Sequence, residues 1–101
     1  MGQPAVTIQQ YIDQHKDLAI KEMKRTGVPA SIKLAQGIHE TMAGQSPLVL
    51  KSNNHFGIKC HNWQGKKMYK DDDTKNECFR VYKTEDESYI DHSEFLKNGK
   101  R

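Results

Sequence analysis

The sequence predicts an α+β fold, with a helical body and a small β-hairpin lobe. Apolar residues recur every three or four positions in the first half of the chain, and two short strand-like runs follow a turn-rich stretch. The last part of the chain then returns to helical spacing. With 101 residues the chain has the length of one domain, so we expect a single domain over residues 1–101.

Two helices are expected before residue 45. The first should cover residues 7–26, with Thr7 as the N-cap, and should stop at Gly27 because Pro29 follows closely. The second should begin at Pro29 and run to Gly44, with Leu34, Ala35, Ile38 and Met42 on its apolar face.

The second half should begin with one helical turn over residues 48–50, followed by a loop over residues 51–59. Strands are expected at 66–70 and 78–82, on either side of the polar segment 71–77, and together they predict a β-hairpin. A final helix should contain residues 88–96, since its spacing is helical and the acidic residues 85–87 suit a helix N-terminus.

The charge pattern excludes some classes of protein. The net charge is +3, from 16 basic and 13 acidic residues that are scattered along the chain, so we expect no nucleic-acid partner. No apolar run approaches the roughly 20 residues that span a bilayer, so we expect no membrane insertion. The first ten residues lack the basic start and apolar stretch of a signal peptide. The chain is expected to be a monomer.

Cys60 and Cys78 lie on the two sides of the predicted hairpin and are well placed to form a disulfide. Closing a loop of this length would stabilise the fold by about 3 kcal/mol on the chain-entropy estimate. Such a bond would place the protein in an oxidising compartment. The alternative is two buried free thiols.

No metal or other cofactor is expected. The candidate ligands lack the paired spacing of a structural zinc site; they are His55, Cys60, His61, Cys78 and His92. His39-Glu40 begins like the H-E-x-x-H motif, but Ala43 stands where the second histidine belongs.

Carboxylates remain as the candidate catalytic groups. Helical spacing turns Gln36 and Glu40 away from the apolar stripe of their helix, which also fits an ordinary solvated carboxylate. Gly37 and Gly44 flank Glu40 and suggest close approach by a ligand, because a glycine inside a helix costs up to about 1 kcal/mol relative to alanine. The triplet 71–73 crowds three aspartates at the hairpin tip, unless it is simply a solvated turn.

Several ordered motifs resemble the glucosaminidase domains of glycoside hydrolase family 73. They are Pro29 to Glu40, Gly44-Gln45-Ser46, Asn53 to Lys59, Trp63-x-Gly65, Phe79 to Tyr82 and Glu87 to Leu96. The resemblance covers nearly the whole chain from about residue 8. It implies a lysozyme-like fold and an endo-β-N-acetylglucosaminidase that cleaves β-1,4 bonds after N-acetylglucosamine in peptidoglycan, in the bacterial periplasm or outside the cell.

The resemblance also assigns roles to residues. Glu40 matches the general acid of the family. The threonine-threonine-glutamate pattern of the second acid is absent, so its best match is Asp72, with Asp71 and Asp73 as the other candidates. The expected substrate-binding residues are Gln36, Asn54, Phe56, Trp63 and Tyr82, although loop packing is the alternative role for Phe56 and Trp63.

One departure from the family lies at the C-terminus. Members continue past the final helix into a glycine-tyrosine-alanine-threonine run and a tyrosine beside the active site, which this sequence does not contain. We therefore expect a domain truncated at its C-terminus. Two other functions stay open at this point: a non-catalytic glycan-binding module with a lysozyme-like cleft, and a small interaction domain with no carbohydrate role.

Overall fold

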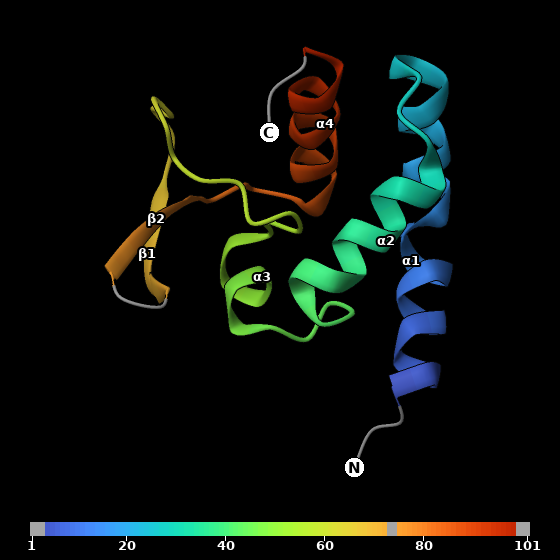
Figure 1. Ribbon diagram of the computed structural model, residues 1–101, viewed down its shortest axis with the longest axis horizontal. Coiled ribbons are helices and arrows are strands. Elements are labelled where there is room, and N and C mark those ends of the chain that lie inside the picture. Colours follow the sequence, from blue (N-terminus) through green and yellow to red (C-terminus); the bar gives the residue numbers. More distant parts are fainter. Residues whose placement is uncertain (1–3, 73–74, 99–101) are drawn as a thin grey trace.

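Helices form the body of the molecule, and a two-stranded hairpin forms a lobe at its side. The computed structural model describes residues 4–72 and 75–98. Its elements in chain order are α1 (Pro4–Thr26), α2 (Ala30–Thr41), α3 (Pro47–Ser52), β1 (Lys67–Asp72), β2 (Lys75–Arg80) and α4 (Glu85–Lys97). Figure 1 shows α1, α2 and α4 grouped together and the hairpin at the opposite end of the molecule. The predicted α+β fold is confirmed.

The long helix α1 packs against both α2 and α4. It begins at Pro4, so Thr7 lies inside the helix and the prediction that Thr7 is the N-cap is wrong. The end at Thr26 is confirmed, and Gly27 follows it with φ +84°. The buried face of α1 is partly polar, with residues spaced by three or four: Tyr11, His15, Ala19 and Glu22.

Helix α2 ends at Thr41, three residues before the expected end at Gly44. The Thr41 hydroxyl donates to the carbonyl of Gly37 and accepts from the amide of Gly44, each at 2.6 Å, and this closes the turn after the helix. The buried residues of α2 are Lys33, Gly37 and Thr41. The expected apolar face, marked by Leu34, Ile38 and Met42, is therefore rotated by one position, and Met42 is 70% exposed.

The hairpin is antiparallel and pairs Lys67 with Arg80 through Asp72 with Lys75. Its second strand lies earlier than the expected 78–82, because the backbone turns away from the hairpin after the Val81 amide, which still donates to the carbonyl of Lys66 at 2.9 Å. The Tyr82 amide instead donates to the carbonyl of Ser52 at 2.8 Å, which attaches this segment to α3. On the other side of β2, Lys59 forms an isolated antiparallel bridge with Phe79.

A disulfide joins Cys60 to Cys78, with a Cα–Cα distance of 5.4 Å. The predicted pairing is confirmed. The bond links the loop that follows α3 to strand β2, next to the bridge between Lys59 and Phe79. It thus attaches the hairpin lobe to the loop that enters the helical body.

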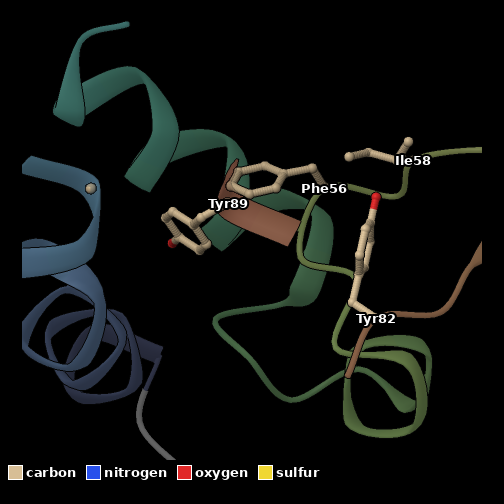
Figure 2. Packing of buried hydrophobic residues seen from close by; sticks show 5 residues of the cluster. Phe56, Ile58, Tyr82 and Tyr89 are labelled. Atoms are coloured by element: carbon tan, nitrogen blue, oxygen red, sulfur yellow. The ribbon is translucent and has the colours of Figure 1, made fainter. Parts of the chain in front are cut away.

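The hydrophobic core is small and lies where the loop after α3 meets α1 and α4. Its buried residues are Ala19, Phe56, Ile58, Tyr82 and Tyr89. Figure 2 shows the ring of Phe56 beside that of Tyr89, and the two rings meet edge to face with centroids 4.8 Å apart. Helix α4 is capped by the Thr84 hydroxyl, which accepts from the amide of Glu87. None of the helices described is long and apolar enough to cross a membrane.

Candidate active site

A groove of about 560 Å³ lies beside the C-terminal end of α2. Helix α2 and the loop after α3 form much of its lining, and α4 supplies the rest. The residues that line it are Ala35, Gln36, His39 and Glu40 of α2, Phe56, Gly57, Ile58, Lys59 and His61 of the loop, and His92, Phe95 and Leu96 of α4. We call it the α2–α4 groove. It brings together Gln36, Glu40 and Phe56 of the predicted site.

Glu40 lies in the last turn of α2, with its side chain exposed and on the wall of the groove. An added Cβ at Gly57 would lie 2.9 Å from the Glu40 Oε1 atom, so the backbone of the loop passes directly beside the carboxyl group. Gly57 also has φ +62°, a conformation that side chains rarely adopt. The structure thus places a carboxylate at a concave surface, where a ligand could reach it.

The sequence predicts Gly57 only as a turn residue of the loop, and close approach by a ligand at Gly37 and Gly44. Those two glycines make room for Tyr11. A Cβ at Gly37 would fall on the Tyr11 hydroxyl, and one at Gly44 would lie 3.4 Å from the ring. The idea that these glycines admit a ligand is therefore wrong, because a buried tyrosine of α1 already fills the space. The Phe56-Gly57 pair was the sequence feature that could have pointed to the correct glycine.

The structure describes only part of the aspartate triplet. Asp71 and Asp72 end strand β1, and their side chains lie outside what the structure describes, as does the whole of Asp73. The identity of the second carboxylate therefore remains a prediction.

Asn54 is 1% exposed and makes hydrogen bonds inside the protein. Its amide nitrogen donates to the carbonyls of Ile58 and Arg80 at 3.0 and 2.9 Å, and its oxygen accepts from the amide of Ile58 at 3.0 Å. The expected substrate contact is not supported by this placement. Asn54 instead fixes the loop that carries Phe56 and Gly57.

Aromatic residues of the predicted site divide into two groups. Phe56 lines the groove and stacks on His92, with centroids 3.7 Å apart. Trp63 and Tyr82 are not among the groove residues and pack on each other, with centroids 5.4 Å apart. The Trp63 indole nitrogen donates to the carbonyl of Lys66, and the Tyr82 hydroxyl donates to Asp91. For Trp63 and Tyr82 the structure therefore shows packing roles at the base of the hairpin.

His92 is a groove residue that sequence reasoning did not assign to the site. Lys33, which is fully buried, donates from Nζ to the His92 Nδ1 atom at 2.9 Å, and also to the Tyr89 carbonyl and the Ser93 hydroxyl. Burial lowers the pKa of Lys33 to about 8. Burial, with the nearby Lys33 charge, lowers the pKa of His92 to about 3. His92 is therefore neutral near pH 7, and its ring proton lies on Nε2 because Nδ1 accepts from Lys33.

Comparison with known proteins gives the family of this fold. The family model described as glucosaminidase, mannosyl-glycoprotein endo-beta-N-acetylglucosaminidase, matches residues 16–101. The chain belongs to the glucosaminidase family. The resemblance to glycoside hydrolase family 73 is thus confirmed, and the match includes the α2–α4 groove.

Relatives of this glucosaminidase-family chain include a curated protein and solved structures. It is 33% identical over 103 residues to the peptidoglycan hydrolase FlgJ of Vibrio cholerae serotype O1, covering 90% of this chain and 31% of that protein. The crystal structure of a peptidoglycan hydrolase from Sphingomonas sp. A1 matches with a TM-score of 0.78 and 31% identity, over 89% of this chain and 62% of that one.

The glycoside hydrolase domain of Salmonella typhimurium FlgJ matches with a TM-score of 0.76 and 23% identity, over 90% of this chain and 61% of that one. This third match supports the fold alone. The fold is lysozyme-like, as the resemblance implied. The chain spans about a third of the length of the curated relative it matches.

Proposed function

We propose that this chain is a peptidoglycan hydrolase, an endo-β-N-acetylglucosaminidase that cleaves the β-1,4 bond after N-acetylglucosamine, with Glu40 as the general acid. The observation that carries the proposal is the position of Glu40 on the wall of a groove of about 560 Å³ in a glucosaminidase-family fold. The similarity to proteins named peptidoglycan hydrolases supports the choice of substrate.

The chemistry requires a carboxylic acid beside the glycosidic oxygen. Protonated Glu40 would donate its proton to the leaving oxygen as the bond breaks, while positive charge develops at the sugar carbon. The position of Glu40 next to the Gly57 backbone lets the sugar chain approach the carboxyl group without a side chain in between. Asp72, with Asp71 and Asp73 as alternatives, is proposed to deprotonate the attacking water or to stabilise the developing charge.

The lining of the groove suits a glycan strand. The faces of sugar rings are apolar, and Phe56, Phe95 and Leu96 offer apolar surface against which they can pack. Gln36 offers an amide for hydrogen bonds to hydroxyl or acetamido groups, and the neutral His92 is a fixed donor at Nε2. We propose Gln36, Phe56 and His92 as substrate contacts. Asn54, Trp63 and Tyr82 hold the loop and the hairpin base that border the groove.

The substrate implies a location. A peptidoglycan hydrolase of this kind acts in the bacterial periplasm or outside the cell, where the Cys60–Cys78 disulfide is stable. We propose that the chain acts there as a monomer on the glycan strand, without a cofactor in the bond-breaking step.

The test is the identity of the sugar at the newly formed reducing end. Purified sacculi are digested with the protein, the products are reduced with borohydride, and the terminal sugar alcohol is identified by mass spectrometry. The proposal expects reduced N-acetylglucosamine. Reduced N-acetylmuramic acid would contradict the assigned bond. Binding to sacculi with no new reducing end would instead select a non-catalytic glycan-binding module, and failure to bind would contradict any carbohydrate role.

A further inference from the structure

A cluster of side chains that could bind a metal ion lies outside the lining of the α2–α4 groove. His15 of α1, His55 of the loop after α3 and Glu85 in the first turn of α4 each place a ligand atom within 4.8 Å of the others. The His55 Nε2 atom lies 3.0 Å from Glu85 Oε2, and the His15 Nε2 atom lies 3.4 Å from Glu85 Oε1. The two imidazoles are buried, whereas the Glu85 side chain is half exposed. The cluster thus opens to solvent on one side.

The hydrogen bond at the other nitrogen of His15 decides what its Nε2 atom can do. Nδ1 lies 2.9 Å from the backbone carbonyl of Tyr11. A carbonyl oxygen only accepts, so Nδ1 must carry the ring proton. A neutral His15 therefore presents the bare lone pair of Nε2 to a carboxylate oxygen. This arrangement is repulsive unless a positive charge, either a second proton or a metal ion, lies between them.

His55 has a similar arrangement. Its Nδ1 atom lies 2.8 Å from the Tyr11 hydroxyl, which in turn lies 2.7 Å from the Tyr89 hydroxyl. Two tautomers fit these contacts. With the ring proton on Nε2, His55 donates to Glu85 Oε2 at 3.0 Å and accepts from Tyr11; with the proton on Nδ1, it donates to Tyr11, Tyr11 donates to Tyr89, and the Nε2 lone pair faces Glu85 as a metal ligand would. Histidine ligands of metals commonly donate the other ring N–H to a carbonyl or another polar group, and this contact fixes the ring and its tautomer.

We propose that His15, His55 and Glu85 bind a divalent transition-metal ion of the zinc class. Two imidazole nitrogens and one carboxylate form a ligand set that zinc accepts, with a fourth position left for water on the solvent side. Calcium and magnesium are disfavoured because they prefer oxygen ligands. The cysteines cannot compete for the ion, because they form a disulfide.

The proposed ion would link three segments that are distant in sequence. It would tie α1 to the N-terminus of α4 and to the loop residue immediately before Phe56 and Gly57. Since these two residues line the groove, the ion would act as a structural cross-link that holds the groove wall. It would take no part in bond breaking.

The experiment is a titration of the oxidised full chain, first freed of metal with a chelator and then dialysed. Calorimetry with Zn²⁺ should give one saturable site, and the thermal midpoint should rise with Zn²⁺. Co²⁺ should give the intense visible absorption of a four-coordinate site. Glu85→Gln and His15→Gln should each weaken Zn²⁺ binding by at least about tenfold, since even outer-sphere partners of a metal change affinity by 10–100-fold.

Asp86→Asn is the matched control, because it removes one negative charge from the same turn of α4 and should leave Zn²⁺ affinity unchanged. Glu85 is half exposed, so Glu85→Gln should keep the native circular dichroism spectrum. The absence of saturable binding to the parent chain would overturn the proposal and leave a proton as the charge between His15 and Glu85. Equal affinity of the parent and Glu85→Gln would also overturn it.

Discussion

The carboxyl group of Glu40 lies against the backbone of Gly57, so close that a methyl group at residue 57 would lie 2.9 Å from Oε1. The two residues belong to different segments, the end of α2 and the loop after α3. The loop is itself held by the internal hydrogen bonds of Asn54 and by the stacking of Phe56 on His92. The position of the proposed acid thus depends on a glycine and on the contacts that fix its loop.

Gly57→Ala should therefore lower the rate of reducing-end release while the chain still folds. The left-handed backbone at φ +62° costs an alanine about 1–2 kcal/mol, and the new methyl group would also displace the Glu40 carboxyl. We expect at least about a tenfold loss of reducing-end release from sacculi, with the fold retained by circular dichroism. Gly27→Ala is the control, because Gly27 has φ +84° but nothing within 4 Å of an added Cβ. Equal activities for the two variants would contradict the proposed role of Gly57.

Gly37→Ala should act on the fold, since its methyl group would overlap the buried Tyr11 hydroxyl. Tyr11 is held by hydrogen bonds to His55 and Tyr89 and cannot move away easily. We expect the free energy of unfolding to fall by about 1–3 kcal/mol, the usual range for overpacking. Urea denaturation measures this change, with exposed Ser31→Ala in the same helix as the control. An unchanged midpoint for Gly37→Ala would show that α2 and α1 can separate at little cost.

Most elements could be predicted from the sequence because periodicity and turn residues decide them locally. The strand bounds could not, because the chain leaves β2 after Arg80 through a backbone hydrogen bond between Tyr82 and Ser52, which are 30 residues apart. The spacing of apolar residues also could not predict which face of α2 is buried. Lys33 is buried there because the Tyr89 carbonyl, His92 and Ser93 accept its three protons. These acceptors lie on α4, so the sequence around Lys33 does not predict its burial.

The same limit applied to the candidate site. Glu40, Gln36 and Phe56 were predicted, and the groove brings them together. Asn54 carries an amide, a group that often binds sugars. In the folded chain, however, this amide donates to the carbonyl of Ile58 in its own loop and to that of Arg80 in a distant strand. The roles of Trp63 and Tyr82 depend in the same way on long-range packing.

The buried His92 should make the protein less stable in acid. Its pKa is lowered from 6.5 to about 3 in the folded state, so between these values the unfolded chain binds a proton that the folded chain does not. Stability should therefore fall as pH decreases from 6.5 toward 3, with a contribution from this group of about 1.4 kcal/mol per pH unit. His92→Gln keeps a polar side chain that does not titrate. Urea midpoints against pH should be flatter for His92→Gln than for the parent, and parallel curves would contradict the assignment.

The disulfide should account for a substantial part of the stability of so small a core. Reduction, or the double change Cys60→Ser and Cys78→Ser, should lower the free energy of unfolding by about 3 kcal/mol. Urea denaturation of the oxidised and reduced chain checks this value. Mass spectrometry of the non-reduced, alkylated chain is the companion measurement. Two alkylated thiols in protein purified under oxidising conditions would contradict the bond.

The most direct test of the account is the initial rate of reducing-end release from purified sacculi by the parent chain and by Glu40→Gln. Glutamine keeps the size of the side chain but has no acidic carboxyl proton to transfer to the leaving oxygen. The control is Glu87→Gln, which changes an exposed glutamate of α4 that does not line the groove. The account predicts that Glu40→Gln loses at least about a hundredfold in rate, in the range of general acid catalysis, and that Glu87→Gln keeps the parent rate. Equal rates for the parent and Glu40→Gln would contradict the central claim.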